Sequence, residues 1–174
     1  VGLGLIGGSI AKAIRKFHPN SVILAYDIDH GSLLLAQKEG TLSKICPAID
    51  GSFASCDYIF LCAPVLYNNE NVRQLLPYLS PSCILTDVGS VKGCIQQTLL
   101  SLGFSGLLIG GHPMTGSEKS DYANSSERLL ENAYYILTPA DQVPPEPIRE
   151  FESFISSLGA LPIILSADMH DTVT

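Results

Sequence analysis

Short apolar runs alternate with segments of helical periodicity along nearly the whole sequence. Residues 21–27 (SVILAYD) and 58–63 (YIFLCA) are largely apolar at consecutive positions, whereas the apolar residues of 6–17 recur at helical spacing. Strands that are apolar on both faces are typical of parallel sheets that helices cover on both sides. The sequence therefore predicts an α/β fold with a doubly wound, mostly parallel sheet.

Turn and cap residues set the boundaries of the predicted elements. Gly40 and Gly103 stand where helices are expected to end, and Pro147 stands where one is expected to begin. Helices are predicted over residues 6–17, 32–39, 69–79, 91–102, around 125–131, and 147–158. Strands are predicted over residues 21–27, 58–63, 83–87, 107–109, 133–138 and 161–165.

Charge and cysteine content exclude several classes of protein. The 174 residues carry a formal net charge of −7 without a basic cluster, so no nucleic-acid partner is expected. No apolar run approaches the roughly 20 residues of a membrane span, so no membrane partner is expected either. The cysteines lack a CxxC pair or a His-rich metal spacing, and we interpret them as reduced core side chains of a cytoplasmic protein without a metal site. They are Cys46, Cys56, Cys62, Cys83 and Cys94.

A glycine pattern opens the first predicted helix. In the spacing Gly-x-Gly-x-x-Gly, the first glycine allows a tight turn, the second lets a pyrophosphate approach the backbone, and the third lets the helix pack on the sheet. Asp27 ends the next predicted strand, 20 residues after Gly7, where a carboxylate accepts hydrogen bonds from ribose hydroxyls. The pattern predicts a dinucleotide site. Its predicted cofactor-binding residues are Gly2, Gly4, Leu5, Ile6, Gly7 and Asp27.

The residues after Asp27 bear on the choice of dinucleotide. Ile28, Asp29 and His30 follow it, without an arginine or lysine to neutralise a 2′-phosphate. NAD is therefore favoured over NADP, which stays possible, and a protonated His30 would weaken the distinction. The alternative interpretation is a glycine-rich turn that serves packing alone, with Asp27 as a helix cap.

Further cofactor contacts are expected where other strands end. In a doubly wound sheet, ligands lie at the carboxyl ends of the strands. Residues 64–65, 88–90 and 111–116 follow three predicted strands, and we expect them around one crevice. Ala63, Pro64 and Ser90 are predicted to contact the cofactor there.

Residues 110–120 (GGHPMTGSEKS) set a histidine between two glycines and a proline. Turn formers crowd this stretch and helix formers are absent, so His112 is predicted to lie on a shaped loop. Two interpretations are open: the ring transfers a proton, or it is a polar side chain satisfied at a turn.

The motifs together carry a resemblance to a known family. Residues 2–9 (GLGLIGGS), 85–92 (LTDVGSVK), 110–120 and 131–139 (ENAYYILTP), in this order and spacing, resemble the prephenate dehydrogenase family over nearly the whole chain. The resemblance implies a Rossmann-type NAD(P)-binding domain and the oxidative decarboxylation of prephenate to 4-hydroxyphenylpyruvate in tyrosine biosynthesis. Some members of the family use arogenate and form tyrosine directly.

The resemblance also implies roles for residues in the crevice. The reaction needs a base for the hydroxyl proton of the substrate, and histidine suits this task near neutral pH. His112 is predicted to be that base, and Ser90 to hydrogen-bond the same hydroxyl, although a serine ahead of a helix is also an ordinary N-cap. Thr115 and Gly116 are predicted to contact the substrate. The chain departs from the family pattern at Thr115 and Asp121, away from the proposed chemistry.

We expect the chain to be part of a longer protein. Residues 1–165 are predicted to form the NAD(P)-binding domain, with a truncated first strand. Residues 166–174 are predicted to begin a helix that links to a C-terminal helical domain absent from this chain. The resemblance implies that the absent domain forms a homodimer and supplies groups that bind the substrate carboxylates.

Other titratable residues are interpreted as structural. His18 and His170 are predicted to be lone surface or core histidines. Lys92 and Lys119 flank the predicted crevice and would attract an anionic substrate, yet solvated lysines are the more common case. Asp87 is expected to cap its strand or to position the following loop.

Two rival functions stay open. One is another NAD(P)-dependent dehydrogenase, of the β-hydroxyacid or pyrroline-carboxylate reductase type, in which a lysine or another acid–base group would replace the histidine. The other is a module that senses NAD without catalysis. Turnover of prephenate with NAD separates both from the main interpretation.

Overall fold

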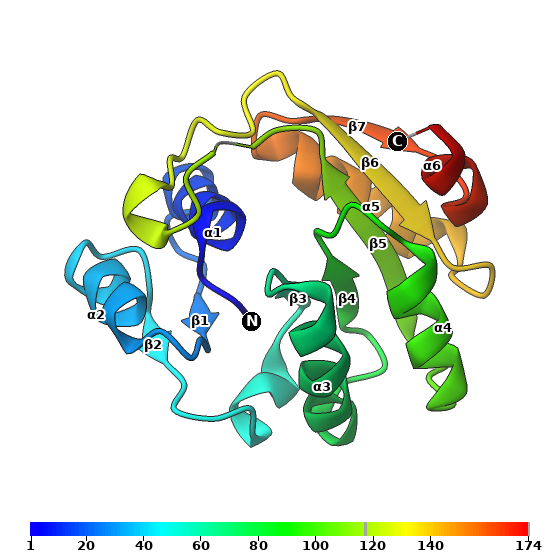
Figure 1. The fold of residues 1–174 in the computed structure, drawn as a ribbon, viewed down its shortest axis with the longest axis horizontal. Coiled ribbons are helices and arrows are strands. Elements are labelled where there is room, and N and C mark those ends of the chain that lie inside the picture. The colour runs from blue at the N-terminus through cyan, green and yellow to red at the C-terminus, as the bar shows by residue number, and fades with distance from the viewer. Residues whose placement is uncertain (117, 174) are drawn as a thin grey trace.

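The structure is a computed structural model that describes residues 1–116 and 118–173; Ser117, Thr174 and the side chains of Cys94 and Val173 lie outside the description. In the described part the strands form two sheets (Figure 1). The smaller sheet consists of β1 (Leu24–Ala25) and β2 (Lys44–Ile45). The larger sheet has the order β3 (Tyr58–Leu61), β4 (Ile84–Asp87), β5 (Leu107–Pro113), β6 (Tyr134–Pro139) and β7 (Leu161–Ile164).

Neighbouring strands of the described residues run parallel, apart from β5 and β6. These two pair antiparallel from Ile109 opposite Pro139 to Pro113 opposite Tyr135. The prediction of an α/β fold with a mostly parallel sheet is confirmed. The strand predicted over 107–109 is longer than expected, because pairing with β6 continues it to Pro113.

Helices cover both faces of the larger sheet. The described helices are α1 (Leu5–Phe17), α2 (His30–Lys38), α3 (Val65–Leu75), α4 (Gly93–Ser101), α5 (Pro145–Ser157) and α6 (Ala167–Val173). Figure 1 shows α3 and α4 in front of the sheet and α5 behind it. The end of α1 meets α5, where the rings of His18 and Phe154 lie 5.4 Å apart. None of the helices described is both long and apolar enough to cross a membrane.

Most helix boundaries agree with the prediction. Gly40 and Gly103 follow α2 and α4 with φ of +76° and +71°, the left-handed conformation that glycine readily adopts after a helix. A helix also begins at Ala167, close to the expected position. α3 begins earlier than expected, at Val65 directly after Pro64, and its first turn therefore reaches the predicted crevice.

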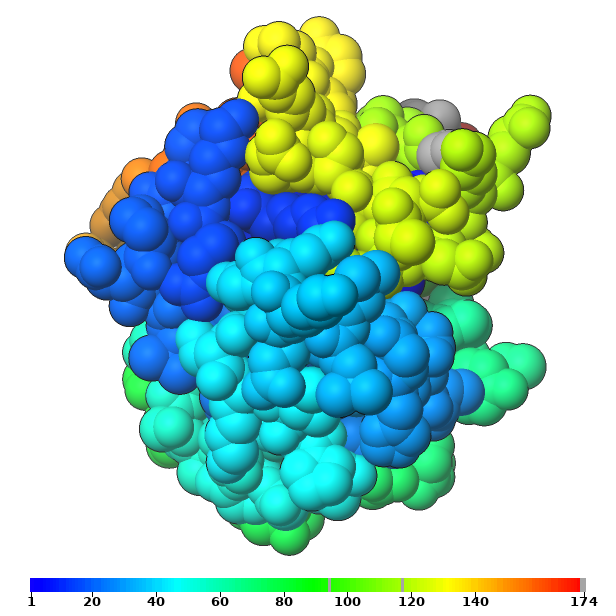
Figure 2. All heavy atoms as spheres, turned by 90° about the vertical axis from the view of Figure 1, so that its left-hand side faces the viewer, coloured from blue at the N-terminus to red at the C-terminus, as the bar shows by residue number. Residues whose placement is uncertain are grey.

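The helix predicted around 125–131 is wrong. A short 3-10 turn (Tyr122–Asn124) precedes the segment, and the segment itself holds only turns. The hydroxyl of Ser125 donates to the carbonyl of the turn, and the backbone N–H of Ser126 donates to Ser9 Oγ at 3.0 Å, so local polar groups are bonded outside any helix ladder. The turn packs against α1 and α2, and Figure 2 shows this segment, in yellow-green to yellow, beside both helices.

The two sheets meet through the first residues of the chain. β1 is shorter than the strand predicted over 21–27, and it pairs with β2, for which no strand was predicted. The N-terminal amine of Val1 donates to Phe60 O at 2.8 Å, and Gly2 N donates to Tyr26 O at 2.9 Å. Val1 and Gly2 thereby hold the end of β1 beside β3.

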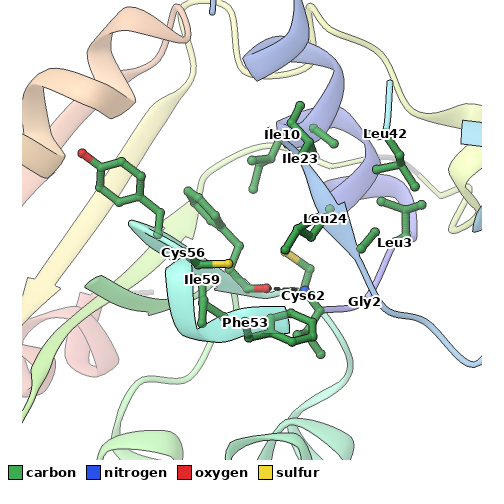
Figure 3. Close-up of a pocket in the computed structure, with 16 residues that line it drawn as sticks. Gly2, Leu3, Ile10, Ile23, Leu24, Leu42, Phe53, Cys56, Ile59 and Cys62 are labelled. Carbon is green, nitrogen blue, oxygen red and sulfur yellow. Dashed lines mark hydrogen bonds between the residues drawn. The ribbon is translucent and has the colours of Figure 1, made fainter. Parts of the chain in front are cut away.

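A cavity of about 110 Å³ lies between the two sheets (Figure 3). Leu24 of β1 and Ile59 of β3 are among its lining residues, and the lining side chains are apolar apart from Cys56, Cys62 and Tyr58. Burial raises the pKa of the Cys62 thiol to about 11 and also raises that of Cys56. Both thiols are therefore protonated near neutral pH and pack as small core side chains, as predicted.

Candidate active site

A groove of about 660 Å³ runs along the carboxyl ends of β1, β3 and β4, at the first turns of α1 and α3. Most of the predicted site residues line it: Gly2, Gly4, Leu5, Ile6, Asp27, Ala63, Pro64, Ser90, Thr115 and Gly116. Among the described residues, Gly7 and His112 are predicted site residues outside its lining. Tyr67 and Asn71 line it without having been predicted, and Tyr67 belongs to the first turn of α3, which begins earlier than the sequence pattern indicated.

The glycine turn at one end of the groove is tightly packed. Gly2 has a φ of +87°, and a Cβ there would collide with the backbone of Cys62 and Ala63. A Cβ on Gly7 would collide with the carbonyl oxygen of Gly2. Gly7 therefore lets α1 approach the turn from beneath, which is the packing role predicted for the third glycine.

Asp27 stands at the end of β1 with its carboxylate held in place. Its oxygens accept hydrogen bonds from Leu3 N and, at 2.7 Å, from Asp29 N. The interpretation of Asp27 as a helix cap is wrong, because Asp29 caps α2 by accepting from Gly31 N at 3.0 Å. Asp27 lines the groove, where its remaining lone pairs suit the hydroxyls of a ribose.

Helix N-termini face this part of the groove. α1 begins at Leu5 and α3 at Val65, and both residues line it. Leu5 N donates to Ser120 O at 2.7 Å, so the loop after β5 reaches across to the first turn of α1. Backbone N–H groups and helix dipoles at such ends favour anions, which suits the pyrophosphate of a dinucleotide.

A buried ion pair lies at the other end, beneath β5. Asp87 Oδ2 accepts from Gly89 N at 2.9 Å and from Lys92 Nζ, which also donates to Gly111 O. Lys92 is 1% exposed, so the solvated lysine expected from the sequence is wrong. Burial lowers the pKa of Lys92, against the attraction of Asp87. The pair anchors the loop after β4, as expected for Asp87.

The two glycines before His112 have a packing role. A Cβ on Gly110 would collide with Thr138 Oγ1 and lie 3.2 Å from the Lys92 side chain. A Cβ on Gly111 would lie 2.7 Å from the Asp87 carbonyl oxygen. Residues without a Cβ thus let β5 lie directly on the ion pair, with His112 as the next residue along the strand.

His112 belongs to β5, opposite Ile136, so the loop predicted for it is wrong. Its ring is half-buried, and its Nδ1 lies 2.8 Å from Nε2 of His170. The two rings meet edge to face, with centroids 5.0 Å apart. The prediction that His170 is a lone histidine is also wrong: it is fully buried, and its Nδ1 lies 2.7 Å from Asp171 Oδ1.

The surroundings of His112 favour its neutral ring. Burial lowers its pKa from the ordinary value of 6.5, the neighbouring His170 and Lys92 lower it further, and Asp87 opposes them. A neutral imidazole near pH 7 is able to accept a proton. The geometry therefore leaves a neutral imidazole on β5, next to the buried Asp87–Lys92 pair.

Ser90 lines the groove and is exposed, in the loop between β4 and α4. The interpretation of Ser90 as an N-cap is wrong, because α4 begins at Gly93 and the carboxylate of Asp171 accepts from Lys92 N and Gly93 N, each at 3.0 Å. Ser90 thus lies at the groove rather than at the end of the helix. Thr115, three residues beyond His112, lines the same groove.

Comparison with known proteins adds a family to this geometry. The family model described as "Prephenate dehydrogenase, nucleotide-binding domain" matches residues 10–164. Prephenate dehydrogenase of Lactococcus lactis subsp. cremoris is 38% identical over 100% of this chain and 48% of its own length. Prephenate dehydrogenase of Bacillus subtilis is 35% identical over 99% of this chain and 47% of its own length. The chain spans about half the length of these curated relatives.

Solved structures of similar sequence share the fold. Synechocystis arogenate dehydrogenase superposes with a TM-score of 0.89 at 29% identity, over 98% of this chain and 59% of that one. Prephenate dehydrogenase from Aquifex aeolicus, in complex with hydroxyphenyl propionate and NAD+, superposes with a TM-score of 0.89 at 30% identity, over 99% of this chain and 60% of that one. The described domain therefore has the Rossmann-type fold of these enzymes.

Proposed function

The chain belongs to the prephenate dehydrogenase family, and on this basis we propose that its protein oxidatively decarboxylates prephenate to 4-hydroxyphenylpyruvate with NAD. The observation that carries the proposal is the half-buried His112, with a lowered pKa, beside a groove that holds a glycine turn and Asp27. A dehydrogenase of this type needs both a dinucleotide site and a base.

The residues of the groove fit NAD. The turn at Gly2 and Gly4 and the N-terminus of α1 suit the pyrophosphate, and Asp27 suits the hydroxyls of the adenosine ribose. Ile28 and Asp29 follow Asp27, so a 2′-phosphate would meet a second carboxylate rather than a cation. The Aquifex aeolicus relative, solved with NAD+, supports the same choice.

Side chains of this chain would handle the proton of the substrate. When bound, NAD supplies the acceptor for the hydride that leaves C4 of prephenate. His112 takes the proton of the C4 hydroxyl, so that this carbon is left as a carbonyl. The C1 carboxylate then departs as carbon dioxide, and the electron pair of that C–C bond, with enolisation of the carbonyl, completes the aromatic ring of 4-hydroxyphenylpyruvate.

Ser90, Thr115 and Gly116 are proposed to meet the substrate. Ser90 lies at the groove with its hydroxyl outside the cap of α4, so it is able to hydrogen-bond the C4 hydroxyl and orient it toward the base. Thr115 and Gly116 continue from β5 along the same wall. Arogenate is the alternative substrate, supported by the similarity to the Synechocystis enzyme.

The arrangement of the whole protein is part of the proposal. We expect residues 1–165 to form the NAD-binding domain and α6 to lead toward further groups that bind the substrate carboxylates. The homodimer and the cytoplasmic location stay predictions from the family resemblance and the cysteine pattern.

The full-length protein tests the function directly. NADH formation at 340 nm is measured with prephenate and with arogenate, for the parent and for His112→Asn. Loss of a positioned base lowers kcat on the order of 10²–10⁴-fold, while the Kd for NAD stays the same. His18→Asn is the matched control, because that ring bonds Ser157 at the far end of α1, and its kcat stays near the parent value. Binding of NAD without turnover of either substrate would contradict the proposal.

A further inference from the structure

A second histidine and a carboxylate stand behind the proposed base. His170 and Asp171 belong to α6, 58 residues along the chain from His112, yet His170 is fully buried against its ring. Asp171 is bonded to His170 and to the first backbone N–H groups of α4. The proposed reaction uses neither residue, and the buried ring of His170 has both nitrogens hydrogen-bonded, one to the proposed base and one to a carboxylate.

We infer that His170 and Asp171 are positioning residues that leave Nε2 of His112 as the nitrogen that accepts the proton. This inference rests on the proposed function of His112. Neither residue needs to touch the substrate, because both act through the ring of the base.

The order of the hydrogen bonds decides the tautomers. Asp171 is held as a carboxylate: burial raises its pKa, but hydrogen bonds from Lys92 N, His170 and Gly93 N outweigh burial and lower it. A carboxylate only accepts, so Nδ1 of His170 carries the hydrogen between them. Nε2 of a neutral His170 then accepts, and the hydrogen between the two rings sits on Nδ1 of His112. The lone pair of His112 is left on Nε2.

The same arrangement receives the charge that the reaction creates. When His112 gains a proton, its Nδ1–H already points to His170, whose other nitrogen faces the carboxylate of Asp171. Among the described residues, the groups that shift the pKa of His112 are His170 from α6, Lys92 before α4 and Asp87 from β4, and Asp171 lies behind His170. Lys92 and His170 oppose a positive charge on the ring of His112, whereas Asp87 favours it.

Asp171 also connects the two proposed catalytic segments. Its oxygens accept from Lys92 N and Gly93 N, just after the loop that carries Ser90. Through His170 the same carboxylate reaches His112 on β5. One side chain thus fixes the spacing between the loop of Ser90 and the strand of the base.

The tautomer is measurable without substrate or NAD. In the full-length protein labelled with ¹⁵N-histidine, long-range ¹H–¹⁵N correlation spectra distinguish an Nδ1–H ring from an Nε2–H ring, and His112→Asn assigns the signals. We expect both His112 and His170 as Nδ1–H tautomers. In Asp171→Asn the amide can donate to His170 Nδ1, which reverses both rings. An Nε2–H ring at His112 in the parent protein overturns the inference, whatever the activity.

Kinetics supply the second measurement. Asp171→Asn and His170→Gln are expected to lower kcat about 100-fold or more, with KM for prephenate and Kd for NAD within about threefold. Asp168→Asn, an exposed carboxylate on the same helix, is the matched control and keeps the parent kcat. The inference is overturned if Asp168→Asn lowers kcat and thermal stability as much as Asp171→Asn does. It is also overturned if His170→Gln keeps the parent kcat. A parent protein that binds NAD but leaves prephenate and arogenate unchanged would refute the proposed function instead, while the spectra still report the tautomers.

Discussion

The two ends of the groove are built in opposite ways. The glycine-turn end is formed mainly by residues 1–27, with residues 63–65 and Ser120 beside them, and presents mainly backbone N–H groups with one carboxylate. The histidine end combines residues 87–92, 110–112 and 170–171, and depends on ionic and titratable side chains, of which Asp87, Lys92 and His170 are buried. The first end depends on backbone shape, and the second depends on charges that only the folded chain brings together.

The sharpest difference between the ends is expected at the buried ion pair. Lys92→Met leaves Asp87 buried without its cation, because Lys92 Nζ is its partner beneath β5. Removing one partner of a buried pair costs about 3–5 kcal/mol of the free energy of unfolding. Urea denaturation of the full-length protein measures this loss.

The control for that variant is an exposed pair. Lys16→Met removes the bond of Lys16 to Glu131, whose side chains are 38% and 37% exposed, and it is expected to cost less than about 1 kcal/mol. Equal losses in the two variants would mean that burial of the Asp87–Lys92 pair does not matter to stability. The distinction between the two ends would then fail.

The glycine-turn end is expected to break through shape alone. Gly2→Ala forces a Cβ into the backbone of Cys62 and Ala63 at a φ of +87°. Strain of the left-handed backbone costs about 1–2 kcal/mol, and overlap adds about 1–3 kcal/mol. We expect loss of NAD binding together with the lower free energy of unfolding, measured by calorimetry and denaturation.

Gly40→Ala separates these two contributions. Gly40 has a similar φ of +76°, but a Cβ there has no heavy atom within 4 Å among the described residues. This variant therefore reports the backbone strain alone and leaves NAD binding intact. If Gly2→Ala cost no more than Gly40→Ala, the close approach of the turn to β3 would have no energetic role.

Local signals in the sequence predicted the glycine-turn end well. The spacing of Gly2 and Gly7 and the position of Asp27 are set by one turn, one helix and one strand, and all three lie within 27 residues. The same is true of Gly40 and Gly103, whose position after a helix follows from backbone conformation alone. Such features need no knowledge of the rest of the fold.

The histidine end was predicted only in part, for a physical reason. His112 stood out in its motif, but its strand conformation depends on pairing with β6, and its partner His170 is 58 residues away. Lys92 resembles any solvated lysine until β5 covers it. Long-range pairing and burial decide these features, and one sequence carries no local signal for them. The early start of α3, in contrast, could have been predicted from the sequence, because Pro64 directly precedes its first residue, Val65, and proline is common where helices begin.

A moderate effect on NAD binding is expected from Asp27, the charged side chain of the glycine-turn end. Asp27→Asn removes a charged acceptor for the ribose hydroxyls, which is worth about 1.5–3 kcal/mol, and so raises the Kd for NAD about 10- to 100-fold. Asp29→Asn is the control, because Asp29 caps α2 and does not line the groove in the described residues. Titration calorimetry of the two variants decides; a Kd that rises equally in both would assign the effect to the loop rather than to the carboxylate.

The smallest expected effect is a difference in pH dependence between kcat/KM, which reports on the histidine end, and the Kd for NAD, which reports on the glycine-turn end. Burial, His170 and Lys92 lower the pKa of His112 below 6.5, and a base acts only when unprotonated, so kcat/KM should fall on the acidic side with a midpoint below 6.5. In His170→Gln the residual activity should show this midpoint moved upward, since one cause of the lowering is gone. The backbone groups of the turn end do not titrate in this range, so the Kd for NAD should change less than about twofold between pH 5.5 and 7.5. A midpoint above 6.5 would contradict the assignment of the titrating group to His112. A Kd for NAD that follows the same pH curve as kcat/KM would place that group at the cofactor site. In either case the two ends would not differ in their pH dependence as their contacts imply.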